Sequence, residues 1–71
     1  MIMQPVRNSS QLAMAGWENG EMQIQFSSGA TYSYSSVPQE LFFEMVDAPS
    51  PGKVFQAKIK NHPELYPHTK L

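Results

Sequence analysis

The sequence predicts an α+β fold, in which a three-stranded antiparallel β-meander is followed by two α-helices packed on one face of the sheet. Short runs of alternating apolar and polar side chains between residues 12 and 36 are typical of antiparallel strands joined by tight turns. Between residues 38 and 60 the apolar side chains recur instead at the spacing of helix turns. A chain of 71 residues has room for one such domain.

The Asn19-Gly20 pair predicts the first hairpin, because both central residues of a type I′ turn need positive φ. This turn joins strands over residues 12–18 and 21–27. It predicts three opposed pairs: Trp17 with Met22, Ala15 with Ile24, and Ala13 with Phe26. Counting outward from the turn, the buried face carries Ala13, Ala15, Trp17, Met22, Ile24 and Phe26. The opposite, open face carries Leu12, Met14, Gly16, Gln23 and Gln25.

The third strand, over residues 30–36, contains Tyr32 and Tyr34, whose spacing of two puts them on one face. A three-residue loop at Ser27-Ser28-Gly29, with its glycine in the left-handed conformation, places both tyrosines on the buried face. A two-residue loop at the same place swaps the faces and exposes both rings beside the glutamines. We expect the three-residue loop, because serine is a poor first residue of a type I′ turn and glycine suits the bulge position.

Two helices are predicted next, over residues 38–48 and 51–60. Pro38 suits the first position of a helix, and Pro49 ends it. The following Ser50-Pro51 pair supplies an N-cap and a first residue for the second helix. The apolar faces of the sheet and helices together predict a core made of Trp17, Ile24, Phe26, Leu41, Phe42, Met45, Phe55 and Ile59.

We divide the chain into an N-terminal arm (1–11), a single domain (12–61) and a C-terminal tail (62–71). The arm is expected to be extended or to form a short first strand, and Leu65 and Tyr66 are expected to anchor the tail on the domain. The chain has no cysteine, no signal-peptide pattern and no apolar run long enough to cross a membrane. These features predict a cytoplasmic protein.

The chain carries no combination of residues typical of catalysis, so we expect neither an enzyme nor a cofactor. His62 and His68 have no third metal-binding residue beside them, so no metal site is expected. The formal charge is −1 overall, but it is −4 over residues 1–48 and +3 over residues 49–71. This separation indicates that the molecule is electrically polar, with the basic charge in its C-terminal third.

The candidate binding residues are aromatic or basic. Two tyrosines on one strand can stack nucleic-acid bases, although such rings also commonly complete a core. Basic side chains contact phosphates, and an aromatic ring on the polar side of a helix is a frequent contact point for another protein. On these grounds the candidates are Tyr32, Tyr34, Arg7, Lys53, Lys58, Lys60 and Phe43.

Seven short motifs occur along the chain in the order Asn8-Ser9-Ser10, Gly16-Trp17, Phe26-x-x-Gly29, Tyr32-x-Tyr34, Val37-Pro38, Ala48-x-Ser50-x-Gly52 and Phe55-x-x-x-Ile59. In order and spacing they resemble the KTSC domain family, whose hallmark is the Tyr-x-Tyr pair. That family is named after the C-terminal domain of some lysyl-tRNA synthetases, and it also occurs as free-standing small proteins of bacteria and phages. The resemblance implies RNA binding as a candidate function.

Two functions are therefore expected. The first is a small non-enzymatic module that binds RNA or another single-stranded nucleic acid. The alternative is a protein–protein interaction module, such as a phage or prophage accessory or regulatory protein. The near-neutral charge, Phe43, and the pair Leu12 and Met14 on the open sheet face indicate this second function.

Overall fold

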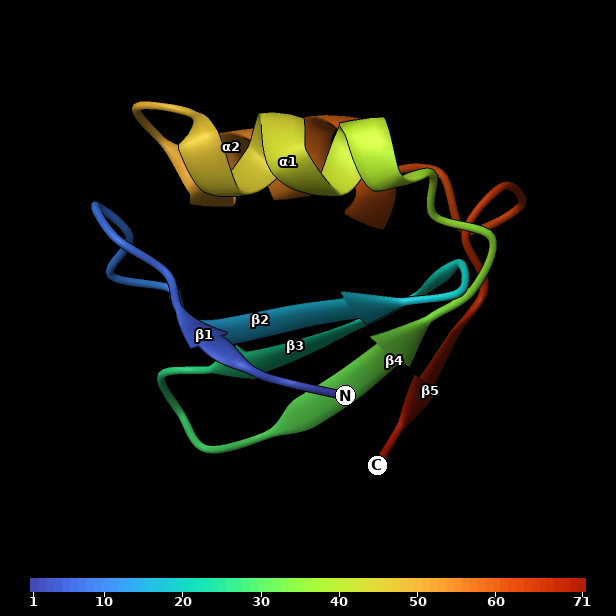
Figure 1. Ribbon diagram of the computed structural model, residues 1–71, viewed down its shortest axis with the longest axis horizontal. Helices are drawn as coiled ribbons and strands as arrows, with labels where there is room; N and C mark the ends of the chain where they lie inside the picture. The colour runs from blue at the N-terminus through green and yellow to red at the C-terminus, as the bar shows by residue number, and fades with distance from the viewer.

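A layer of helices covers one face of a five-stranded antiparallel sheet in the computed structural model, which describes residues 1–71 (Figure 1). The strands are β1 (Gln4–Pro5), β2 (Leu12–Glu18), β3 (Glu21–Phe26), β4 (Thr31–Tyr34) and β5 (His68–Lys70). The helical elements are α1 (Gln39–Asp47), α2 (Pro51–Phe55) and the π-helical turn η1 (Gln56–Lys60). The α+β prediction is confirmed, and none of the helices is long and apolar enough to cross a membrane.

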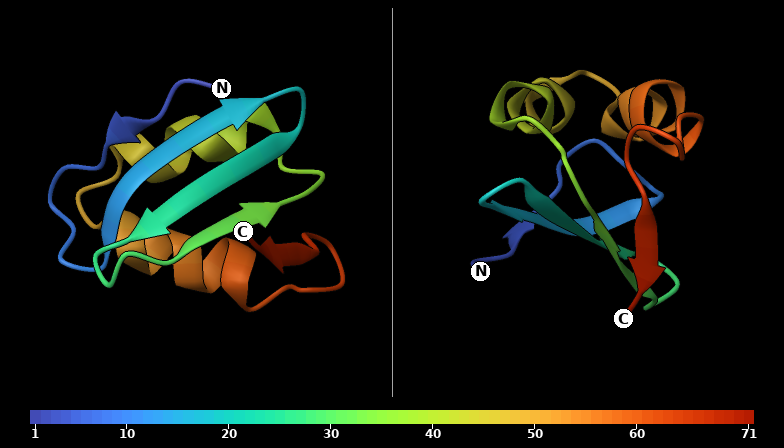
Figure 2. Two further views of the ribbon diagram at one scale, coloured as in Figure 1. Left: turned by 90° about the horizontal axis from the view of Figure 1, so that it is seen from below. Right: turned by 90° about the vertical axis from the view of Figure 1, so that its right-hand side faces the viewer.

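The strands lie side by side in the order of the chain, and every pair is antiparallel. The predicted three-stranded meander forms the centre of this sheet, as β2, β3 and β4. The N-terminal arm adds β1 at one edge, and the segment predicted as a tail adds β5 at the other (Figure 2). Backbone hydrogen bonds from Ser35 to Pro67 and from Leu71 to Thr31 enclose the β4–β5 pairing, each at 2.9 Å.

The first hairpin has the predicted turn, since Asn19 and Gly20 both have positive φ and Trp17 lies opposite Met22. The predicted pairing of Ala13 with Phe26 is wrong, because a β-bulge between Leu12 and Met14 shifts the register. Leu12 lies opposite Phe26 instead. A bulge inserts one unpaired residue into a strand, so the side chain before it changes face. Leu12 is consequently 1 % exposed in the core, and its predicted place on the open face is also wrong.

The predicted three-residue loop before β4 is confirmed. Gly29 has a φ of 99°, which residues with a Cβ rarely adopt, and the Phe26 N–H donates to the Ala30 carbonyl at 2.8 Å. The register places Tyr32 opposite Ile24 and Tyr34 opposite Met22, on the face that the helices cover.

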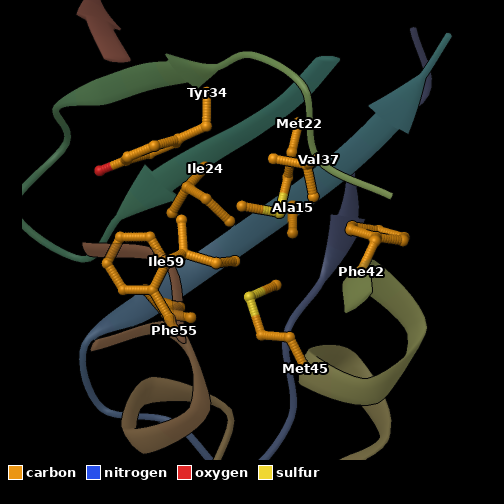
Figure 3. Packing of buried hydrophobic residues seen from close by; sticks show 10 residues of the cluster. Ala15, Met22, Ile24, Tyr34, Val37, Phe42, Met45, Phe55 and Ile59 are labelled. Carbon is orange, nitrogen blue, oxygen red and sulfur yellow. The ribbon is translucent and has the colours of Figure 1, made fainter. Parts of the chain in front are cut away.

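The hydrophobic core lies between the sheet and the two helices (Figure 3). It consists of Leu12, Ala15, Met22, Ile24, Tyr34, Val37, Phe42, Met45, Phe55 and Ile59. Of the eight predicted core residues, Trp17, Phe26 and Leu41 are only partly buried and pack against this cluster. Trp17 remains at the edge because its indole N–H donates to the Val37 carbonyl, at 2.7 Å.

The second helix is continuous but changes its hydrogen-bonding pattern half-way. From Gln56 the turns widen, and the Asn61 N–H donates to the carbonyl of Gln56, five residues earlier, at 3.1 Å. Phe55 and Ile59 remain buried on the sheet side of this helix. The helix therefore supplies both of its predicted core residues, although the π-helical turn was not predicted.

The N-terminal arm runs beside β2 at the edge of the sheet and lies against Gly16 (Figure 2). A Cβ at Gly16 would lie 2.7 Å from the Ile2 carbonyl oxygen and 2.8 Å from the Met3 sulfur. Only glycine permits this approach, and Met14 is partly covered beside Pro5 of β1. Figure 1 accordingly shows both chain ends on the side of the sheet away from the helices.

Candidate functional site

The largest pocket is an open groove of about 480 Å³ between η1 and the side of the sheet formed by β4 and β5. In the right-hand view of Figure 2, the helix that ends in η1 lies directly above β5. We call this pocket the aromatic groove; its lining residues are Gln11, Phe26, Ser27, Ser28, Ala30, Tyr32, Tyr34, Ile59, Lys60, Pro63, Tyr66 and His68.

Ring contacts fix the wall of the aromatic groove. His68 of β5 lies opposite Tyr34 in the sheet, and its ring centroid is 5.6 Å from that of Tyr34 and 5.7 Å from that of Tyr32. Tyr32 in turn meets Phe26 edge to face at 5.6 Å. Offset and edge-to-face contacts of this length stabilise aromatic side chains in one orientation. The groove is therefore walled by rings that neighbouring strands hold in place.

The two tyrosines contribute differently to this site. Tyr34 is 5 % exposed and packs edge to face on Phe55, with ring centroids 5.4 Å apart. Figure 3 shows its hydroxyl pointing away from the middle of the core cluster. Tyr32 is only half-buried. Burial, followed by the neighbouring Tyr32, raises the pKa of the Tyr34 hydroxyl above its ordinary value, so the Tyr34 ring is neutral at physiological pH.

The charge of the aromatic groove is positive. Its lining includes Lys60 and His68 and no carboxylate, although the chain has six acidic residues and a formal charge of −1. Lys70 lies opposite Tyr32 on the neighbouring strand. Glu64 is the acidic residue nearest in sequence to Lys60 and His68, and its Oε1 atom lies 3.4 Å from His62 Nδ1. The groove thus combines aromatic surface with the unpaired cationic side chain of Lys60.

The structure places the other predicted site residues in separate surroundings. Lys58 forms an ion pair with Glu44 of α1. Lys53 lines a different, wholly polar pocket, and Arg7 is exposed on the N-terminal arm outside the three main pockets. Of the four basic candidates, only Lys60 lies with the tyrosines.

Phe43 lies on a third surface. It is 50 % exposed, its ring centroid is 5.7 Å from that of Phe42, and it lines a pocket of about 270 Å³ with Ile2 and Trp17. The tail residues Leu65 and Tyr66 are not part of this pocket. We call it the Phe43 pocket; unlike the aromatic groove, it contains a carboxylate, Glu18, and no basic side chain.

Sequence reasoning did not identify Tyr66 and His68 as site residues, because it treated residues 62–71 as a tail. Strand β5 is formed by pairing with a strand more than 30 positions earlier, and local pattern carries little information about such a contact. A signal was nevertheless present, since Tyr66, His68 and Lys70 alternate with a period of two, as one face of a strand does.

The open face of the sheet carries a polar network rather than a pocket. Glu21 Oε2 accepts hydrogen bonds from Gln23 Nε2 at 3.0 Å and from Ser33 Oγ at 2.7 Å. These two bonds hold the pKa of the Glu21 carboxyl below its ordinary value, with Gln23 the larger influence. No group of three His, Cys, Asp or Glu side chains is arranged to hold a metal ion.

Comparison with known proteins identifies the family. The sequence profile of the KTSC domain matches residues 8–62. The chain belongs to the KTSC domain family. A protein of Tsukamurella paurometabola is 38% identical over 60 residues, which cover 82% of this chain and 88% of that protein. A crystal structure of a KTSC domain protein from Yersinia pestis matches 99% of this chain and 96% of its own, with a TM-score of 0.87 at 30% identity.

The KTSC domain profile includes Tyr32 and Tyr34 and ends before the C-terminal strand. Pro63, Tyr66 and His68 therefore line the aromatic groove from outside the matched segment. The similar chain from Yersinia pestis is covered almost completely, so the fold it shares with this protein extends beyond the KTSC profile.

Proposed function

We propose that this protein is a small, non-enzymatic, cytoplasmic module that binds single-stranded nucleic acid, RNA in particular, in the aromatic groove. The observation that carries the proposal is the composition of that groove, in which half-buried rings lie beside Lys60 and His68 without a carboxylate. Single-stranded nucleic acids are bound by this combination, because bases stack on rings while cationic side chains meet phosphates.

In this proposal the rings that stack on bases are those of Tyr32 and Tyr66, and Tyr34 of the Tyr-x-Tyr pair does not take part. The Tyr34 side chain is almost completely buried in the core, whereas Tyr32 and Tyr66 are half-buried at the wall of the groove. Base stacking contributes about 1–3 kcal/mol per base. Loss of one stacking ring therefore weakens binding by roughly 5- to 150-fold.

Fluorescence anisotropy with labelled RNA and DNA oligonucleotides of about eight nucleotides tests this proposal. We expect binding that weakens between about 50 mM and about 200 mM salt, because phosphate contacts release counterions. Tyr66→Ala should weaken binding, while Phe43→Ala, which removes an exposed ring on another surface, should not. Circular dichroism of both variants confirms that they are folded.

Two results would contradict nucleic-acid binding in the aromatic groove. One is that none of the tested oligonucleotides shows detectable binding, even at low salt. The other is equal binding by the wild type and Tyr66→Ala with loss in Phe43→Ala. The second result would indicate that the oligonucleotide binds at the Phe43 pocket instead.

The Phe43 pocket favours a second candidate function, which is protein–protein interaction. Phe43 is 50 % exposed and Ile2 is 83 % exposed. Exposed apolar side chains that line a surface pocket are typical of protein–protein contacts. Leu12 no longer contributes to this argument, because it is buried in the core. A pull-down from the native host with wild type and Phe43→Ala tests this function; a partner protein retained equally by both would contradict it.

A further inference from the structure

We propose that the polar pocket around Lys53 is a phosphate-binding subsite for the strand that occupies the aromatic groove. This inference rests on the proposed function and extends it. It specifies a ligand of more than one nucleotide, with a base in the aromatic groove and a neighbouring backbone phosphate beside Lys53.

The polar pocket has a volume of about 220 Å³ and contains no hydrophobic side chain. It is formed by the arm segment Asn8–Gln11 and by the start of the second helix at Ser50, Gly52, Lys53 and Gln56. Two of the motifs that resemble the KTSC family, Asn8-Ser9-Ser10 and Ala48-x-Ser50-x-Gly52, are separated in sequence and meet here.

The two pockets adjoin each other. Gln11 lines both the polar pocket and the aromatic groove. Its side-chain carbonyl accepts a hydrogen bond from Gln56 Nε2 at 2.9 Å, on the exposed surface. The Gln11–Gln56 pair thus forms a polar boundary between the pockets, across which an extended strand passes without meeting a charged group.

The chemistry of the polar pocket suits a phosphate. Lys53 is its only charged lining residue, so an anion there meets no opposing carboxylate. Ser9 Oγ accepts the backbone N–H groups of Gln11 at 3.2 Å and of Leu12 at 3.0 Å. Those bonds use the oxygen as an acceptor and leave the hydroxyl proton available to donate. Hydroxyl, amide and ammonium donors are the groups that commonly contact phosphate oxygens.

The spacing of the lysines sets the length of the ligand. Lys53 and Lys60 lie near opposite ends of the second helix, seven positions apart, and each lines one of the two pockets. At the roughly 1.5 Å rise per residue of an α-helix, this spacing corresponds to about 10 Å along the axis. A ligand with a phosphate at each lysine and a base in the aromatic groove extends from one pocket into the other, as a strand of several nucleotides does.

The test measures the salt dependence of oligonucleotide binding in three single variants. Lys53→Gln, Lys60→Gln and Lys58→Gln each remove one positive charge; Lys58 is the matched control, because it is paired with Glu44 outside both pockets. For Lys53→Gln and Lys60→Gln, we expect the slope of log affinity against log salt to fall by about 0.7 each. For Lys58→Gln we expect the wild-type slope.

The outcomes separate this inference from the proposed function. If the wild type does not bind the oligonucleotide, both are overturned. If Lys60→Gln weakens binding but Lys53→Gln behaves like Lys58→Gln, the phosphate subsite is excluded while binding in the aromatic groove stands. A reduced slope in Lys53→Gln, with oligonucleotide-induced NMR shifts at the backbone amides of residues 8–11, supports the subsite.

Discussion

Replacement of Tyr34 by alanine provides a direct test of the strand register on which the site depends. The Tyr34 side chain is 5 % exposed and packs between Phe55 and His68. Tyr32, two positions earlier, is only half-buried. We expect Tyr34→Ala to destabilise the fold strongly and Tyr32→Ala to destabilise it less.

The magnitude follows from the buried area. A buried aromatic side chain removes about 150–250 Å² from water, which at about 25 cal/mol per Å² corresponds to roughly 4–6 kcal/mol. Alanine retains its Cβ and the unfolded chain is not fully extended, so we expect a loss of about 3–5 kcal/mol. A domain of 71 residues has a total stability of about 4–11 kcal/mol. Tyr34→Ala is therefore expected to lower Tm by at least about 12 °C.

Thermal and urea unfolding followed by circular dichroism provide the measurement, and Tyr34→Phe provides the control. None of the side-chain hydrogen bonds involves the Tyr34 hydroxyl. We therefore expect Tyr34→Phe to cost less than about 0.5 kcal/mol. The reasoning is refuted if Tyr34→Ala melts within a few degrees of the wild type, or if Tyr32→Ala is the more damaging variant.

Three further measurements test other parts of the structure. Because Gln23 and Ser33 lower the folded-state pKa of Glu21, its stabilising contribution is present above the unfolded-state pKa and is lost as pH falls through the folded-state pKa. The Tm difference between wild type and Glu21→Gln should therefore shrink on acidification, and a constant difference would argue against the network. Burial raises the folded-state pKa of Tyr34, so the Tyr34 contribution to folding stability is complete below the ordinary tyrosine pKa of about 10 and decreases above it. Tyr34→Phe should therefore resist alkaline unfolding better than the wild type. Gly29→Ala should cost about 1–2 kcal/mol in urea unfolding because φ is positive there, and an unchanged midpoint would mean that the loop has another conformation.

The sequence was sufficient to predict the meander and the face of the tyrosines, because both depend on turn chemistry. Asn19-Gly20 and Gly29 each require positive φ, and each fixes the register of the strand that follows. The helices were predictable from their proline boundaries and apolar spacing, with α1 beginning one residue after Pro38. These signals lie within a few residues of the structure they determine.

The errors lie where structure depends on distant contacts. The bulge beside Leu12 breaks the alternation of β2, and the period-two pattern contains no indication of it. Strand β5 forms only because β4 offers it an unpaired edge, so Tyr66 and His68 were assigned to a tail. Two of the five rings that line the aromatic groove, Tyr66 and His68, were therefore missed, although their period-two spacing with Lys70 was present in the sequence.

The two outer strands have a consequence for the behaviour of the protein at high concentration. An unpaired sheet edge can nucleate aggregation by pairing with extended segments of other molecules. Here β1 has two residues, one of them a proline without an N–H, and β5 has three residues that end at Lys70. Short edges, proline and lysine all oppose such edge-to-edge growth. We therefore expect concentrated samples to resist fibril formation, even though only 15% of the residues are charged.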